Sequence, residues 1–181
     1  MLLLTGSPGT GKTTVLRKVV NTLKEKGYSV GGVISREVRE DGVRVGFEIV
    51  DLSSEKRGWL AYVNQKTGPQ VGKYHVNLEA LEKVGAQSIT AALENCDVVA
   101  IDEVGPMELF SEKFKDATRK ALGSARLVIA VVHRKAQDKL ISDAKKMREA
   151  ETYTVTAENR DDLSKTIAEK AIKATEKTEN N

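Results

Sequence analysis

The chain has 181 residues, of which 40% are hydrophobic and 30% charged, and its 29 Lys and Arg nearly balance its 26 Asp and Glu. This length allows one domain with a substantial core. The balanced charge and the 4% of aromatic residues disfavour a platform that binds nucleic acid. The absence of a run of ~20 apolar residues disfavours a membrane span. Cys96 is the single cysteine and the opening residues do not resemble a signal peptide, so we expect a cytoplasmic location.

The N-terminal part of the chain alternates apolar runs with turns. Residues 1–4 are apolar and precede the glycine-rich stretch GSPGTGKTT, after which a one-sided apolar pattern predicts a helix that ends at Gly27. Residues 30–35 and the run VRVGFEIVDL flank an Asp41-Gly42 pair, which predicts a β-hairpin. Because residues 36–76 contain few helical patterns and several turns, we expect a β-rich insertion there.

The C-terminal part alternates helical and strand patterns. Helices are predicted after Asn77, with Gly85 as a potential interruption, and after Ser111, and further helices over residues 140–147 and 163–171. The apolar residues 98–101 and 127–132 predict buried strands, and residues 153–155 predict a short one. This alternation predicts a three-layer α/β/α fold on a mainly parallel sheet, with one domain over residues 1–175 and a frayed tail over 176–181.

The stretch from Gly6 to Thr13 matches the phosphate-binding pattern G-x-x-x-x-G-K-[ST]. Its small residues let backbone N–H groups approach phosphate oxygens, and the helix that starts near Lys12 directs its positive end to the same place. Lys12 is expected to reach the β- and γ-phosphates, Thr13 to coordinate Mg²⁺ and Thr14 to bind the α-phosphate. A glycine-rich turn without a ligand is the alternative. The predicted nucleotide-binding residues of the loop are Gly6, Ser7, Pro8, Gly9, Thr10, Gly11, Lys12, Thr13 and Thr14.

Two adjacent acids, Asp102 and Glu103, follow the apolar run VVAI. A phosphate-binding loop needs a carboxylate from a neighbouring strand to hold the metal, and Asp102 fits this role. Glu103 could then face the γ-phosphate and polarise a water molecule, which favours hydrolysis over transfer to another acceptor. The alternative for Glu103 is a solvated loop position or a cap of the following helix.

Charge that develops in the transition state requires a cation besides Lys12 and Mg²⁺. Arg57 is the first candidate because Gly58 and the only tryptophan, Trp59, adjoin it; the other candidates are Arg36, Arg39, Arg44, Arg134 and Arg160. Asn159 and Arg160 are candidates for a contact with the base, although they could also cap the last helix. The guanine-selective pattern N-K-x-D is absent, so strict GTP specificity is not expected.

Some proteins with such loops place an additional strand between the strand of the loop and the strand of the acids. By analogy, residues 127–132 would occupy this central place in the sheet. His133, which directly follows them, could then sense the γ-phosphate. The equally favoured alternative is a histidine at a strand end that is bonded to a backbone carbonyl.

Five stretches occur in the order seen in a small P-loop nucleoside-triphosphatase family, namely GSPGTGKTT, REVREDGVRVGFEIVDL, VGKYHVNLEALE, IDEVGPMEL and VTAENRDDL. From Met1 to about Leu163 the chain resembles this family, which includes the vertebrate cancer-related nucleoside triphosphatase and archaeal and bacterial counterparts. The resemblance implies a RecA-like sheet and Mg²⁺-dependent hydrolysis of ATP, GTP, CTP and UTP to the diphosphate and phosphate. It also implies that Asp102 handles the metal and Glu103 activates water. One departure is GVIS at residues 32–35, where the family often has an aromatic stretch.

Two other functions are left open by the sequence. A nucleotide or nucleoside kinase would have a similar size and sheet, but no arginine-rich lid is recognisable and Glu103 favours water as the acceptor. A nucleic-acid-dependent ATPase is suggested only by the RecA-like core, and the composition disfavours it. Nucleoside triphosphates are therefore the expected partners, without a membrane or nucleic acid, and the sequence does not indicate the oligomeric state.

Overall fold

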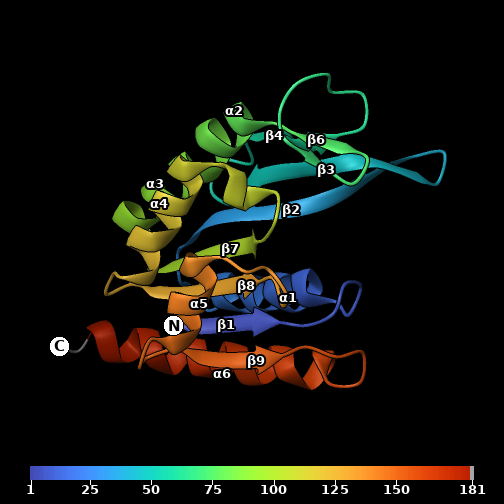
Figure 1. The fold of residues 1–181 in the computed structure, drawn as a ribbon. Helices are drawn as coiled ribbons and strands as arrows, with labels where there is room; N and C mark the ends of the chain where they lie inside the picture. The colour runs from blue at the N-terminus through green and yellow to red at the C-terminus, as the bar shows by residue number, and fades with distance from the viewer. Residues whose placement is uncertain (180–181) are drawn as a thin grey trace.

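The computed structural model describes the backbone of residues 1–179 and the side chains of residues 1–176. The described chain forms one nine-stranded sheet in the order β5-β6-β4-β3-β2-β7-β8-β1-β9, and helices cover both of its faces (Figure 1). This arrangement confirms the predicted three-layer α/β fold. Within the described residues, every helix is too short or too polar to cross a membrane.

Five parallel strands form one half of the sheet, in the order β2-β7-β8-β1-β9. The strand β8 lies between β1 and β7, as predicted for residues 127–132. Because parallel strands end at the same edge, the segments that follow β1, β7 and β8 meet there. The bounds of the five strands are β1 Leu2–Thr5, β2 Val30–Glu40, β7 Val98–Val104, β8 Leu127–Val132 and β9 Glu151–Thr154.

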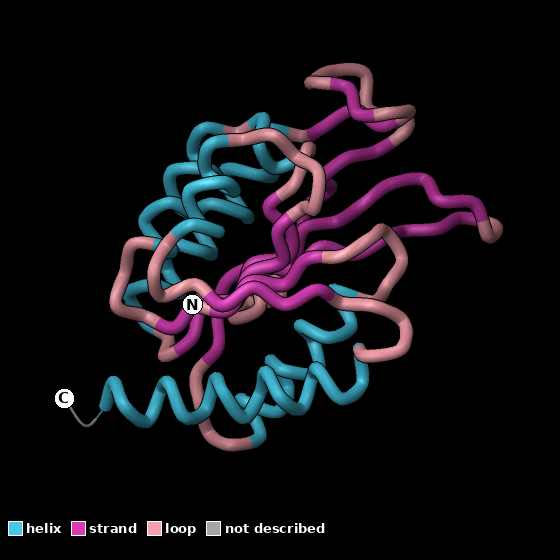
Figure 2. Tube along the Cα trace, turned by 60° about the horizontal axis from the view of Figure 1, so that its bottom comes forward, coloured by secondary structure: helices cyan, strands magenta, loops and turns pink. Residues whose placement is uncertain are grey.

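Alternate residues of the parallel strands point to opposite faces and build two hydrophobic cores. Leu2 and Leu4 pack with the helices α1 (Lys12–Glu25) and α6 (Arg160–Glu179), whereas Leu3 packs into the core on the other face. The opposite core is covered by α3 (Gln87–Asn95), α4 (Glu112–Leu122) and α5 (Lys139–Lys146). Figure 2 shows the strands between these two groups of helices. Burial on both faces explains why the parallel strands are continuously apolar.

The antiparallel half of the sheet is the predicted β-rich insertion. The strand β2 turns at Asp41 and Gly42 into β3 (Val43–Asp51), and both turn residues have the positive φ of a two-residue hairpin (48° and 77°). The sheet continues through β4 (Arg57–Tyr62), β6 (Tyr74–Val76) and β5 (Gln70–Val71). Trp59 on β4 stacks on Tyr62, with the ring centroids 4.4 Å apart.

Gly85 does not interrupt the helical segment that follows Asn77. This segment is continuous through α2 (Leu78–Ala80), the π-helical turn η1 (Leu81–Ala86) and α3. A Cβ atom on Gly85 would lie 2.8 Å from the ring of Phe114, so the glycine makes room for a helix packed against it. The predicted caps are confirmed, because Asn77 accepts the N–H of Ala80 (3.0 Å) and Ser111 accepts that of Phe114 (3.2 Å).

Two predicted boundaries were wrong. The strand of the two acids continues to Val104, which pairs with Val132 after an irregularity in the ladder. The last helix continues to Glu179, and its Thr175 is still buried, so the tail predicted from residue 176 is helical up to that point. Residues 180–181 lie outside the described residues. The extent of the domain, residues 1–175, stays a prediction.

Candidate functional site

The loop between β1 and α1 carries the glycine-rich motif. Gly9 and Gly11 have φ values of 79° and 96°, a conformation that L side chains rarely adopt. The helix α1 begins at Lys12, as predicted, so its first backbone N–H groups face the loop. The ammonium of Lys12 donates a hydrogen bond to the carbonyl of Ser7 at 3.2 Å. The loop therefore combines the N–H groups at the start of a helix with a cation, which is the arrangement that binds phosphate.

A cavity of about 850 Å³ opens beside this loop, a volume typical of small-molecule sites. It joins the ends of β1, β7 and β8 to the insertion. Near the loop it is lined by Glu103, Glu108, His133 and Arg134, and along the insertion by Arg36, Arg44, Phe47, Leu60 and Val71. Residues predicted from separate stretches of the chain are therefore brought together in one cavity.

Asp102 is buried on β7, with 2% of its surface exposed. Among the described residues, neither of its carboxylate oxygens accepts a hydrogen bond. Burial raises the pKa of Asp102 to about 7, although the hydroxyl of Thr13 and the charges of Arg17 and Lys12 oppose this rise. Oxygen donors without protein partners suit a hard divalent cation, so Asp102 and Thr13 fit the predicted metal site.

Glu103 follows Asp102 within the strand, and a cis peptide bond joins the two residues. Its side chain is half-buried and lines the cavity on the strand next to β8. The alternative of a solvated loop position therefore does not describe Glu103. The two adjacent acids therefore have different surroundings, because Asp102 is buried whereas Glu103 faces the cavity.

Glu108 is a site residue that the sequence analysis missed. It begins the short 3₁₀ turn η2 (Glu108–Phe110), is 6% exposed, and its Oε2 accepts the N–H of Gly105 at 3.1 Å. Burial raises the pKa of Glu108 to about 8, and the negative charges of Glu103 and Asp102 act in the same direction. A Cβ atom on Gly105 would lie 3.0 Å from Glu103 Oε1 and 3.3 Å from Glu108 Oε2, so the two carboxyl groups flank this glycine.

The structure favours a different arginine from the one first predicted. Arg57 begins β4, where it pairs with Val50, and it does not line the cavity. The strands β3 and β2 separate it from the acids on β7. Arg134, which follows β8, lines the cavity and donates a hydrogen bond from Nη1 to Ser7 Oγ at 3.2 Å. Arg134 therefore contacts the loop from the end of the strand next to β1, whereas Arg57 does not reach it.

Asn159 and Arg160 lie at the start of α6, outside the residues that line the cavity. The side chain of Asn159 closes the preceding turn, because Oδ1 accepts the N–H of Thr156 (2.8 Å) and Nδ2 donates to the carbonyl of Thr154 (2.9 Å). Arg160 packs beside the loop, where its Cδ lies 3.2 Å from the place of a Cβ atom on Gly11. The side chain of Asn159 thus belongs to the turn before α6, and Arg160 lies next to the phosphate-binding loop.

His133 lines the cavity, but its ring also closes the turn after β8. Its Nδ1 accepts the backbone N–H groups of Lys135 (3.2 Å) and Ala136 (3.0 Å). The partners are N–H groups rather than the carbonyl considered from the sequence. A neutral ring that accepts at Nδ1 carries its proton on Nε2.

Comparisons with known proteins show the family to which this chain belongs. The profile of the family described as NTPase matches residues 1–168. The nucleoside-triphosphatase THEP1 of Methanopyrus kandleri is 46% identical over 172 residues (94% of either chain), and that of Thermofilum pendens is 45% identical over 167 residues (92% of either chain).

Two solved structures have the same fold. The crystal structure of THEP1 from Aquifex aeolicus superimposes with a TM-score of 0.81 at 29% identity, over 92% of this chain and 96% of that one. The solution structure of a human cancer-related nucleoside triphosphatase superimposes with a TM-score of 0.76 at 34% identity, over 92% and 94%. With a family match over nearly the whole chain and relatives above 40% identity, this chain belongs to the NTPase family.

Proposed function

We propose that this protein is a nucleoside-triphosphatase that hydrolyses nucleoside triphosphates to the diphosphate and phosphate in the presence of Mg²⁺. The names of its relatives support the reaction class. The observation that carries the proposal is the buried, unpaired carboxylate of Asp102 beside Thr13, with Glu103 next to it in the cavity of the phosphate-binding loop.

Each residue of the cavity has a role in this proposal. The N–H groups of the loop and the ammonium of Lys12 would hold the β- and γ-phosphates. Asp102 and Thr13 would hold Mg²⁺, which when bound neutralises charge on the phosphate oxygens. Glu103 would orient a water molecule and accept its proton, and Arg134 would stabilise the negative charge of the transition state.

The proposed substrates are ATP, GTP, CTP and UTP. The groups assigned to binding contact phosphates, which all four nucleotides share, and the side chain of Asn159 is engaged in its own turn. A cytoplasmic location stays a prediction that rests on the single cysteine, which is free in the structure. A kinase would need an acceptor, so release of free phosphate without any added acceptor distinguishes hydrolysis from transfer.

The roles of the two acids can be tested separately. Glu103→Gln preserves size but removes the charge that polarises water, so we expect nucleotide binding to persist while single-turnover phosphate release falls on the order of 10²-fold. Asp102→Asn should weaken Mg²⁺-dependent binding as well, in titrations with a fluorescent triphosphate. Glu25→Gln, an exposed change on α1, is the matched control. Normal single-turnover release by Glu103→Gln would refute the assignment of the base.

A further inference from the structure

The cavity continues past the acids into the insertion. Phe47 on β3, Leu60 on β4 and Val71 on β5 line this far end, together with Met107 from the loop after β7. In the sheet, β2, β3 and β4 lie on the side of β7 away from β8 and β1. The apolar wall therefore lies across Glu103 from the phosphate-binding loop. None of the groups proposed to bind the triphosphate belongs to this wall.

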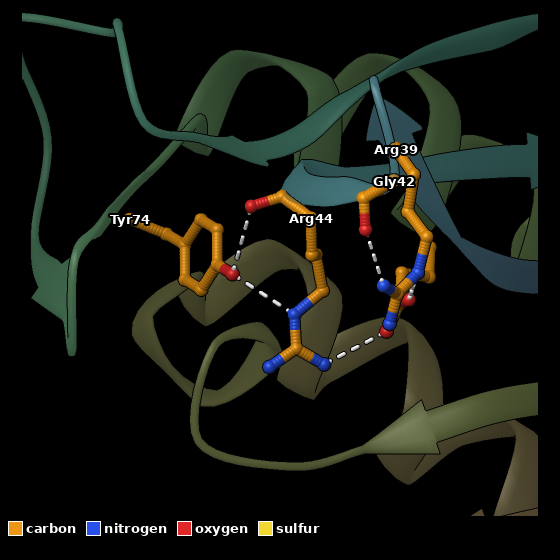
Figure 3. A network of polar contacts seen from close by, with 5 residues as sticks. Arg39, Gly42, Arg44 and Tyr74 are labelled. Atoms are coloured by element: carbon orange, nitrogen blue, oxygen red, sulfur yellow. Dashed lines mark hydrogen bonds and ion pairs between the residues drawn. The ribbon is translucent and has the colours of Figure 1, made fainter.

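Two cations, Arg36 and Arg44, line the insertion side of the cavity, and the guanidinium of Arg44 is held in place by its neighbours (Figure 3). Its Nε donates to the hydroxyl of Tyr74 at 2.9 Å and its Nη1 to Glu37 at 2.8 Å, and its central carbon lies 5.3 Å from the ring centroid of Phe47. Among the described residues, Nη2 of Arg44 has no hydrogen-bond partner. A fixed guanidinium with one nitrogen available loses little entropy when it binds an anion.

The charges around Arg44 limit the charge of such an anion. Glu37 also pairs with Arg39, and Glu48 pairs with Arg36 at 2.5 Å. These three arginines and two glutamates leave a single net positive charge, and Lys73, whose ammonium lies 5.5 Å from the ring centroid of Tyr74, does not line the cavity. That balance suits a monoanion and disfavours a second triphosphate, which carries several negative charges.

We propose that the insertion end of the cavity is a second ligand site, which binds a small organic monoanion with an aromatic ring. The ring would pack against Phe47, Leu60 and Val71, and the anionic group would accept a hydrogen bond from Nη2 of Arg44. Apolar walls with one placed polar group are typical of small-molecule sites. The proposal concerns binding alone and does not depend on hydrolysis at the loop.

A fluorescent aromatic sulfonate, 1-anilinonaphthalene-8-sulfonate, has this chemistry and serves as the probe. It is titrated into the protein with and without saturating Mg²⁺ and ADP, which occupy the loop. We expect one equivalent of probe to bind in both conditions, with dissociation constants that agree within about twofold. Complete displacement of the probe by ADP would place it at the loop and would overturn the proposal.

Two pairs of matched variants locate the probe. Val71→Glu introduces a charge into the apolar wall and should weaken binding at least about tenfold, whereas Val43→Glu at the exposed hairpin tip should not. Arg44→Gln should weaken binding of the probe about tenfold. Arg39 also pairs with Glu37, so Arg39→Gln is the matched control and should change binding by less than about twofold. Val71 is half-buried in a two-residue edge strand, so the fold should tolerate the change.

Equal losses within either pair would overturn the proposal, because the probe would then be responding to overall charge. Thermal midpoints of all four variants check that they are folded. Phosphate release measured without the probe should persist in Val71→Glu and Arg44→Gln. A loss of release in these two variants would contradict the separation of the second site from the catalytic residues.

Discussion

The buried carboxyl of Glu108 should make the stability of the fold depend on pH in a way that one substitution removes. Glu108→Gln keeps the size of the side chain and an oxygen for the N–H of Gly105, but it cannot ionise. Burial moves the pKa of Glu108 from its ordinary value of 4.5 to about 8. Because one pKa unit corresponds to ~1.4 kcal/mol, ionising this group in the folded state costs on the order of 4 to 5 kcal/mol.

The sign of the effect follows from proton binding. The folded state holds this proton more tightly than the unfolded chain does, so the stabilisation is complete below pH 4.5 and is lost as the pH rises through about 8. The free energy of unfolding of the wild type should therefore fall, relative to the Gln variant, by up to ~1.4 kcal/mol per pH unit over this range. At pH 5 the two proteins should be similar, and at pH 8 Glu108→Gln should be the more stable.

Urea denaturation followed by circular dichroism at pH 5, 6, 7 and 8, without metal or nucleotide, measures this difference. Glu94→Gln, an exposed change on α3, is the control and should follow the wild type. The free energies of unfolding of the wild type and Glu108→Gln could instead differ by the same amount, within about 0.5 kcal/mol, at every pH. Such a constant difference is the usual effect of a surface substitution and would refute the reasoning from burial.

Three further predictions concern the site. Lys12→Ala should abolish the thermal stabilisation by Mg²⁺ and ATP, because it removes the cation that faces the β- and γ-oxygens; an undiminished shift in Tm would contradict the loop assignment. Values of kcat/KM from phosphate release should agree within roughly tenfold, or ~1.4 kcal/mol, across ATP, GTP, CTP and UTP, and a larger preference would reveal a base pocket. Arg134→Gln should lower kcat by about 10- to 100-fold, whereas Arg57→Gln should leave kcat unchanged. A loss of kcat in Arg57→Gln but not in Arg134→Gln would restore Arg57 as the catalytic cation.

The sequence was sufficient to predict the features of the fold that depend on residues close together in the chain. The Asp41-Gly42 hairpin and the caps at Asn77 and Ser111 depend on residues within one turn, and the structure has all three. The glycine-rich loop was likewise found where a strand meets a helix. The place of β8 between β1 and β7 could be expected only by analogy with other folds, because strand order depends on packing across the whole chain.

The parts that sequence reasoning missed depend on contacts between distant residues. Glu108 was not singled out from the sequence, since glutamates are rarely buried, and only the folding of its turn over Gly105 encloses it. The one local signal was its place between Met107 and Leu109 in the stretch that follows the acids. Arg57 was preferred to Arg134 because of its neighbours in sequence, whereas the order of the strands in the sheet decides which arginine reaches the loop.

The stacked ring of Trp59 makes the antiparallel half of the sheet separately visible in spectroscopy. It is the only tryptophan of the chain and lies on β4 in the insertion, whereas most helical residues belong to the two layers around the parallel strands. Indole emission thus reports the insertion, and ellipticity at 222 nm reports the helices. Coincident transitions by the two signals would mean that both halves unfold cooperatively, and separate transitions would mean that the insertion can open while the helical layers stay folded.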